Sequence, residues 1–173
     1  MIPLQLGHAP TWLESLLTSD LALAVLLGIC ILEGTMLLRF MPSELIAPTA
    51  LALVGTSIAD ITVILTITVV GTTIGQTILF FLIRHAGREY LLQKRWFPLT
   101  GARLDRFDSW FDRWGPLAVA GSNTLLFVRG VLTVPAGLSD MQLRSFVTLS
   151  AIGTLSYQSI LTGLYLLGSD MVM

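Results

Sequence analysis

Long apolar runs alternate with short polar breaks along most of this chain. A helix that crosses a bilayer needs about 20 predominantly apolar residues. Runs of that length, or nearly so, cover residues 21–38, 45–83, 116–139 and 143–168, and the second is long enough for two passes. The pattern therefore predicts an all-α integral membrane protein with a single membrane domain over residues 1–173.

Two further segments have the pattern of amphipathic helices at a membrane surface. Residues 11–19 place Trp12, Leu13, Leu16 and Leu17 on one face, so residues 1–20 are expected to form an interfacial helix. Packing of that face against a partner helix is the alternative.

The segment 84–115 is strongly polar and holds seven of the ten Lys and Arg residues. By the positive-inside rule this loop faces the cytoplasm. Apolar side chains recur in it at helical intervals, which predicts a helix on the cytoplasmic surface; they are Leu104, Phe107, Trp110, Phe111 and Trp114.

The hydropathy layout occurs twice. Residues 21–83 form a broken apolar stretch followed by a cleaner span, with the break near Arg39 to Glu44. Residues 116–168 repeat this layout, with the break near Arg129 to Pro135. Interrupted segments at matching positions are typical of inverted repeats with a binding site at their interface.

Charged residues lie inside these runs: Glu33, Arg39, Glu44 and Arg129. Insertion scales put the cost of one central charge at roughly 2.5–3.5 kcal/mol. Re-entrant hairpins lower this cost, because non-helical backbone at membrane depth is tolerated beside protein or a wet cavity. The residues expected to break the two hairpins are Pro42, Gly130, Pro135 and Gly137.

Two interpretations of these charges remain open. The acids and bases can neutralise one another and only hold the hairpins together. Alternatively they line a polar path, because an arginine fork suits phosphate and a semi-buried carboxylate can carry a proton. We expect opposed hairpin tips to meet near the midplane.

Composition agrees with a membrane protein, since 54% of the residues are apolar and only 12% are charged. The N-terminal MIPLQLGHAP lacks the basic start and cleavage site of a signal peptide. The single cysteine, Cys30, and the absence of a Cys/His cluster predict neither a disulfide nor a metal. The net charge of −1 does not suggest nucleic acid. No nucleophile–base pair accompanies Ser122 or Ser156, so no enzyme activity and no cofactor are predicted.

These residues resemble the DedA family, which shares its domain with the VTT (SNARE-associated Golgi) proteins. The resemblance covers roughly residues 28–168. Its strongest parts are Glu33 followed by Pro42-Ser43-Glu44, and Arg129 followed by Pro135-Ala136-Gly137. It implies two opposed re-entrant hairpins and a role in scrambling phospholipids or flipping a polyprenyl phosphate, with proton coupling proposed for some bacterial members.

The chain also departs from the pattern that the resemblance implies. Asn123 stands where the family has the first of two arginines, and Gln76 stands where it has an aspartate. We hypothesise that Arg39 supplies the missing positive charge from the other hairpin. The expected pathway residues are therefore Glu33, Arg39, Glu44, Gln76, Asn123 and Arg129.

The predicted protein is a multi-pass transporter or scramblase of phosphate-bearing lipid in the cell membrane. The alternatives are a proton-coupled carrier of a small solute and a membrane scaffold that transports nothing. The sequence leaves a homo-oligomer open. Two smaller predictions concern Asp60, which follows Ser57 as an N-cap or interfacial anchor, and Gly71 and Gly75, whose spacing lets helices approach closely.

Overall fold

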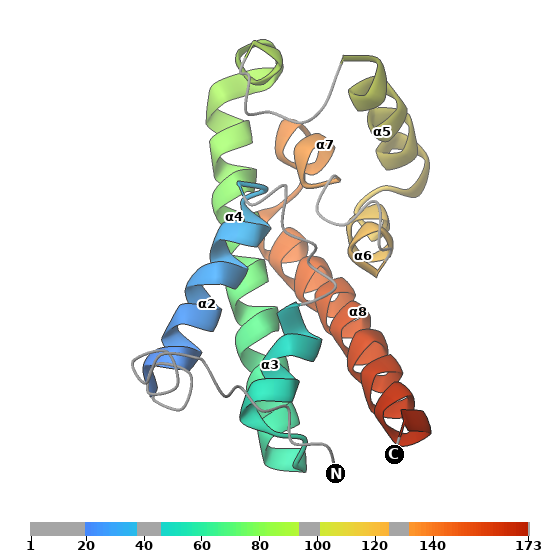
Figure 1. Cartoon of the computed structure of the whole chain (residues 1–173). Helices are drawn as coiled ribbons and strands as arrows, with labels where there is room; N and C mark the ends of the chain where they lie inside the picture. Colours follow the sequence, from blue (N-terminus) through green and yellow to red (C-terminus); the bar gives the residue numbers. More distant parts are fainter. Residues whose placement is uncertain (1–19, 38–45, 94–100, 125–131, 173) are drawn as a thin grey trace.

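The computed structural model describes residues 20–37, 46–93, 101–124 and 132–172, and every regular element in these ranges is a helix. The all-α prediction therefore holds for the described part of the chain. In chain order the helices are α2 (Asp20–Gly34), α3 (Ile46–Val54), α4 (Ile58–Leu92), α5 (Gly101–Trp114), α6 (Leu117–Thr124), α7 (Thr133–Leu138) and α8 (Leu143–Val172). Figure 1 shows the two long helices, α4 and α8, with the shorter helices around them.

The helices α4 and α8 run antiparallel. Phe80 stacks on Phe146 with ring centroids 4.5 Å apart, and one turn earlier on α4 the Gln76 amide contacts Ser150. At the start of α4, Ile64 belongs to a core cluster against which Tyr165 packs. Residue numbers fall along α4 as they rise along α8, so the pair forms one continuous interface.

The start of α4 is fixed by a capping box. The Ser57 hydroxyl donates to Asp60 Oδ2 at 2.6 Å and accepts from the Asp60 backbone N–H at 3.2 Å. The Ser57 N–H donates to the same carboxylate at 3.2 Å. This reciprocal arrangement satisfies N–H groups that have no partner in the first turn. Asp60 was expected as an N-cap or interfacial anchor; the N-cap is Ser57, and Asp60 is its partner three residues later.

The end of α4 differs from the sequence prediction. Helical structure extends into residues 84–92, which were expected to begin the polar loop, but it is interrupted at Gly87, where φ is 75° and ψ is 166°. The left-handed conformation is open to glycine at little cost. Helical structure therefore extends past residue 84, where the polar segment begins, and changes direction at Gly87.

The helix α2 packs against α4 through glycines. A Cβ at Gly75 would collide with the Ile31 carbonyl oxygen, and one at Gly34 would collide with the Thr72 carbonyl oxygen. A Cβ at Gly71 would lie 2.7 Å from Cys30 Cβ. The predicted close approach at Gly71 and Gly75 is thus confirmed, and the partner helix is α2.

The chain turns where α2 ends, about halfway along α4 (Figure 1). The Thr35 hydroxyl donates to the Leu32 carbonyl at 2.7 Å, and Met36 N–H donates to the Glu33 carbonyl at 2.9 Å. Met36 has a positive φ of 62°. These bonds satisfy carbonyl groups that a helix end inside an apolar layer would otherwise leave without partners.

The second pair of short helices lies toward the opposite end of the molecule, near α5 (Figure 1). The helix α6 packs on α8, where a Cβ at Gly153 would collide with the Ala120 carbonyl oxygen. The helix α7 packs on α4, with Val134 buried against Leu79 and Ile83. The first pair of short helices, α2 and α3, and the second pair, α6 and α7, therefore each contact both α4 and α8.

Among the described residues, one helix is long and apolar enough to cross a membrane, Ile58–Gly87. The sequence predicted a second span at 143–168. The helix α8 is 30 residues long but does not reach that apolar threshold, because its inner face carries buried Ser, Thr, Gln and Tyr side chains. Polar side chains also lie on its exposed side, among them Thr148, Ser156 and Ser159.

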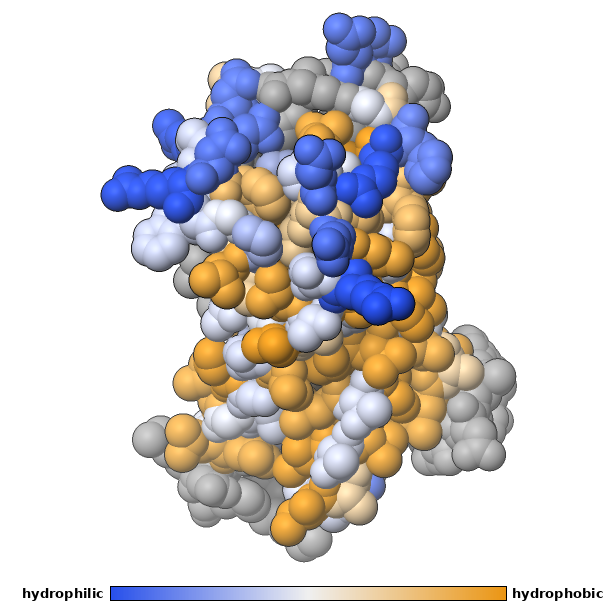
Figure 2. Space-filling view, turned by 180° about the vertical axis from the view of Figure 1, so that it is seen from behind, coloured by the Kyte–Doolittle hydropathy of each residue, from blue (hydrophilic) through white to orange (hydrophobic). Residues whose placement is uncertain are grey.

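The outer faces of both long helices are apolar. On α4 the exposed side chains include Val63, Val70, Ile74, Ile78 and Phe81, and on α8 they include Ile152, Leu155, Ile160, Leu164 and Leu167. In the face that Figure 2 shows, apolar residues cover most of the described surface and hydrophilic residues gather at one end. An apolar surface of this extent is what hydrocarbon, rather than water, would stabilise.

Candidate functional site

Three buried polar side chains from three helices meet inside the fold. Gln76 Nε2 of α4 donates to Asn123 Oδ1 of α6 at 3.0 Å, and Asn123 Nδ2 donates back to Gln76 Oε1 at 3.0 Å. Asn123 Nδ2 also donates to Ser150 Oγ of α8 at 3.1 Å, and the Ser150 hydroxyl donates to Gln76 Oε1. Each of the three is 1% exposed or less.

A second polar contact lies one turn away on the same helix. The Thr72 hydroxyl donates to Glu33 Oε2 at 3.1 Å, which ties the end of α2 to α4. Thr72 is buried and Glu33 is half-buried. We call the five residues Glu33, Thr72, Gln76, Asn123 and Ser150 the polar centre.

The polar centre lies at the middle of the apolar helix. Thr72 is fourteen residues from Ile58 and fifteen from Gly87, the two ends of the membrane-length segment. At 1.5 Å per residue, the centre is roughly 20 Å from either end. In a bilayer spanned by this helix, a group at its middle would be far from headgroups and bulk water, and its polarity would have to be satisfied within the protein.

The geometry satisfies that requirement for the amide pair. An unbonded amide in an apolar medium costs several kcal/mol, roughly 2–7, whereas Gln76 and Asn123 exchange two hydrogen bonds of ordinary length. The pair joins α4 to α6, and Ser150 adds α8. The uncharged side chains of Gln76, Asn123 and Ser150 therefore link α4, α6 and α8 to one another.

Gly153 explains why Asn123 can reach this position. A Cβ at Gly153 would lie 2.8 Å from Asn123 Cβ and would collide with the backbone of α6. The absence of a side chain at residue 153 lets α6 approach α8 closely. The same relation holds between Gly75 and α2, so each long helix admits one short helix at the level of the polar centre.

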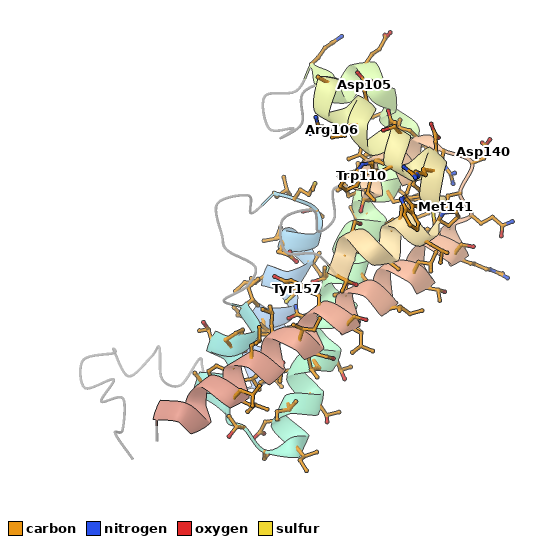
Figure 3. All side chains as sticks on the ribbon, turned by 90° about the vertical axis from the view of Figure 1, so that its right-hand side faces the viewer. Asp105, Arg106, Trp110, Asp140, Met141 and Tyr157 are labelled. Carbon is orange, nitrogen blue, oxygen red and sulfur yellow. The ribbon has the colours of Figure 1, made fainter. Side chains whose placement is uncertain are left out.

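An apolar cluster closes the fold on one side of the polar centre. Its buried members are Phe80, Val119, Ala136, Met141 and Phe146. Arg84 lies beyond it, with its guanidinium 4.8 Å from the Phe80 ring centroid. Arg84 Nη2 donates to the Ser139 and Met141 carbonyls at 2.8 and 3.0 Å. These bonds fasten α4 to the turn between α7 and α8, which Figure 3 marks at Asp140 and Met141.

The helix α5 covers the same end of the molecule. It carries Asp105 and Arg106 away from the core (Figure 3), and its Trp110 and Trp114 are 43% and 66% exposed. The predicted amphipathic helix over LDRFDSWFDRW is therefore present. Exposed tryptophans beside charged residues are typical of a helix at the headgroup level.

The structure brings together three of the predicted pathway residues: Glu33, Gln76 and Asn123. Pro135 and Gly137, predicted to break the second hairpin, both lie inside α7, so neither interrupts the backbone between Thr133 and Leu138. Proline is tolerated there because the first turn of a helix has N–H groups without intrahelical partners. The remaining predicted residues lie outside the described ranges: Arg39, Pro42, Glu44, Arg129 and Gly130.

Sequence reasoning missed Ser150. Its signal was present as a polar stripe on α8, in which Ser150, Thr154, Gln158 and Thr162 recur every four residues. Among the described residues, no group of three or more His, Cys, Asp or Glu side chains could hold a metal ion.

Comparisons with known proteins point to one family. A family model described as the VTT domain matches residues 41–165. The chain is 30% identical over 136 residues to undecaprenyl phosphate transporter A of Staphylococcus aureus (strain NCTC 8325 / PS 47), covering 76% of this chain and 66% of that protein. It is 26% identical over 90 residues to undecaprenyl phosphate transporter A of Bacillus subtilis (strain 168), covering 51% and 46%.

A third relative, the uncharacterized membrane protein YbfM of Bacillus subtilis (strain 168), is 28% identical over 88 residues, covering 50% of this chain and 54% of that protein. This chain thus spans about half to two thirds of the length of these relatives. No solved structure matches it.

Proposed function

This chain belongs to the VTT-domain family, and from that premise we propose that it moves a phosphate-bearing lipid, a phospholipid or a polyprenyl phosphate, across the membrane. The names of its two transporter relatives, both given as undecaprenyl phosphate transporter A, support this substrate class. The proposed route passes through the polar centre and its continuation toward the hairpin tips.

The observation that carries the proposal is the meeting of two polar contacts at mid-span. The Glu33–Thr72 bond comes from α2, and the Gln76–Asn123–Ser150 bonds come from α6 and α8. Polar and ionisable residues at this depth are costly, and in membrane proteins they mark substrate and ion pathways. A headgroup that crosses the bilayer needs polar partners at that depth.

The proposal includes two re-entrant hairpins related as an inverted repeat. The contacts support this, because α2 packs on α4 and α6 packs on α8 in the same way. The second helix of each pair reaches the other long helix, since α3 packs on α8 as well as on α4, and α7 packs on α4. In Figure 1 the two pairs approach the middle from opposite ends.

In this proposal the four charged residues of the hairpins have separate roles. Arg129 and Arg39 bind the phosphate, because guanidinium groups donate in a fork that matches phosphate oxygens. Glu33 and Glu44 carry the proton if transport is proton-coupled. Asn123 and Gln76 position the helices that bring these groups together.

Reconstitution into liposomes tests the proposal. The purified chain should move fluorescent phospholipid or a labelled polyprenyl phosphate between leaflets, and Arg129→Ala should abolish this movement. Arg144→Ala is the matched control, because Arg144 is an exposed arginine at the start of α8. Lipid movement that survives Arg129→Ala would contradict the role assigned to Arg129. If transport is coupled to protons, the rate of lipid movement should change when the liposome interior is made acidic.

One observation favours a second candidate, a membrane scaffold that transports nothing. The Gln76–Asn123–Ser150 cluster has its hydrogen bonds satisfied and needs no ligand. The scaffold predicts no lipid movement with either substrate under any gradient, together with an unchanged thermal midpoint when lipid phosphate is added.

A further inference from the structure

A groove runs along the outside of the contact between α4 and α8. On α4 its lining extends from Val69 to Phe81. On α8 the lining includes Val147 and Ala151. The groove encloses about 480 Å³, which is within the roughly 300–1,000 Å³ of most ligand pockets. Apart from two threonines its lining side chains are valine, isoleucine, phenylalanine and alanine, so it suits hydrocarbon.

The groove and the short helices lie on opposite sides of the contact between α4 and α8. On α4, Leu79 packs on α7, the next residue Phe80 stacks on α8, and the next, Phe81, lines the groove. Successive residues of a helix are about 100° apart, because one turn takes 3.6 residues. On α8, Phe146 stacks on α4 and the next residue, Val147, lines the groove. The α4–α8 contact therefore separates the groove from the polar centre.

The groove covers one half of the membrane-length helix. The middle of Ile58–Gly87 lies near Thr72, so the groove begins close to the middle of the helix at Val69 and ends toward the polar end at Phe81. These two residues are roughly 18 Å apart at 1.5 Å per residue. One leaflet contributes roughly 15 Å, half of a hydrocarbon core of about 30 Å. The groove therefore has the length of one lipid chain in the leaflet at the polar end.

An exposed arginine lies at the polar end of the groove. Arg84 is three residues beyond Phe81, and its guanidinium lies 4.8 Å from the Phe80 ring centroid. Its two hydrogen bonds, to the Ser139 and Met141 carbonyls, are both made by Nη2. A guanidinium has five N–H donors, and Arg84 is exposed. Donors on its other nitrogens are thus left to face a phosphate at the headgroup level.

We propose that this groove binds one phospholipid of the leaflet at the polar end, with an acyl chain between α4 and α8 and the phosphate on Arg84. Basic sites between spanning helices are typical sites for anionic headgroups. The groove is apolar over the length of one leaflet and has its cation at the headgroup end, which matches the charge and shape of a phospholipid. A second copy of this chain fits less well, because a two-fold axis along the membrane normal would bring two Arg84 side chains together.

This inference goes beyond the proposed function. The lipid in the groove is a bound lipid and is not the one that is moved, because the α4–α8 contact separates it from the polar centre. Its test measures binding and not movement between leaflets, so the two proposals can fail independently.

Native mass spectrometry tests the binding. The purified chain in detergent micelles is titrated with phosphatidylglycerol or with phosphatidylcholine of the same acyl chains. Ala151→Trp fills the groove, and Ile152→Trp is its matched control, because Ile152 is 52% exposed and is not part of the groove lining. Arg84→Gln removes the cation. Arg106→Gln is the control for this change, because Arg106 is exposed on α5 and points away from the core (Figure 3).

We expect one molecule of phosphatidylglycerol to bind, with a dissociation constant roughly tenfold higher in Ala151→Trp, because burial of the acyl chain supplies most of the binding free energy. Arg84→Gln should lower the preference for phosphatidylglycerol over phosphatidylcholine by about fivefold, the upper range for one exposed ion pair. Neither control should change these values.

Three outcomes would overturn the site. The first is an affinity that Ala151→Trp leaves unchanged or that Ile152→Trp lowers equally. The second is a lipid preference that Arg84→Gln does not alter. The third is a dimer without bound lipid that Ala151→Trp dissociates, which would assign the groove to a second copy of the chain.

A second measurement uses the unaltered chain and does not depend on the folding of any variant. Phosphatidylglycerol that carries a photoreactive diazirine near the end of one acyl chain is irradiated with the protein in liposomes, and the modified peptides are identified. We expect adducts at Val69 to Ile74, where the groove reaches the middle of the helix. Adducts spread evenly over the exposed apolar residues, including Leu164 and Leu167 of α8, would contradict a defined site.

Discussion

Gln76 and Asn123 illustrate how two residues that look unrelated in the sequence act together. They are separated by 47 positions and exchange two hydrogen bonds of 3.0 Å. They are also the positions where the DedA resemblance implies an aspartate and an arginine. A neutral amide pair keeps the connection between α4 and α6 and avoids burying two charges, which is often no less stable than the ion pair.

A double-mutant cycle tests this relation. Gln76→Asp and Asn123→Arg should each lower the stability by about 3–5 kcal/mol, because each leaves one uncompensated buried charge. The double variant should recover part of the loss, with a coupling free energy of roughly 1–3 kcal/mol. The measurement is thermal or denaturant unfolding in detergent micelles. Strictly additive losses would show that the two side chains do not act as a pair.

Gly75 is the residue on which the α2–α4 contact depends most. Its Cβ would meet backbone of α2 rather than a flexible side chain, so Gly75→Ala should destabilise the protein by about 3 kcal/mol, the upper range for overpacking. Gly28→Ala is the matched control on α2, since nothing lies within 4 Å of its added Cβ. The control should be neutral or more stable, by up to about 1 kcal/mol, because alanine favours a helix.

At the scale of elements, the connection between α7 and α8 depends on a side chain of α4. The sequence placed Arg84 at the first position of a cytoplasmic loop. In the structure it lies within α4, covers the Phe80 ring and donates to two carbonyls of the turn. The short helix α7 is thereby held against α4, which it also contacts through Val134.

Arg84→Lys should weaken this connection although it retains the charge. A lysine ammonium lacks the planar guanidinium that lies over the Phe80 ring while donating to both carbonyls, and we expect a loss of about 1 kcal/mol, since Arg84 is exposed and the interaction is partly screened. Arg144→Lys, at an exposed site on α8, should have no effect on the same unfolding midpoint. Equal midpoints for the two variants would show that the Arg84 bonds contribute nothing measurable.

At the scale of the whole molecule, the arrangement predicts a topology. The start of α2 and the end of α8 lie toward the same end, opposite α5 (Figure 1). If each of the hairpins α2–α3 and α6–α7 enters the membrane and returns to the side from which it came, both termini lie on the side opposite the basic segment 84–115.

Reporter fusions at each terminus test the topology. Phosphatase fusions should be active at both ends and green fluorescent protein fusions dark at both ends, since each reporter works on one side of the membrane alone. A fusion within 94–100 provides the opposite control, because this basic segment is expected in the cytoplasm. Termini on opposite sides would support five plain spans and contradict the hairpins.

Much of the fold was predictable because it depends on local pattern. The helices α6 and α7 both lie inside the apolar run 116–139, and the capping box at Ser57 and Asp60 follows from spacing alone. The helical continuation through residues 84–92 was not predictable in this way. The helical stretches before and after Gly87 are separated by its positive φ, which the sequence permits but does not dictate.

The sequence by itself determined the apolar character and the positions of most helices, which follow from composition and periodicity. It singled out Glu33 by the cost of a charge in an apolar run, and Asn123 only through the resemblance to the DedA family. The tertiary structure decided which of these side chains touch and that Ser150 joins them. Those features depend on how deeply α2 and α6 approach the long helices at Gly75 and Gly153, and that distance arises only from packing between segments far apart in the chain.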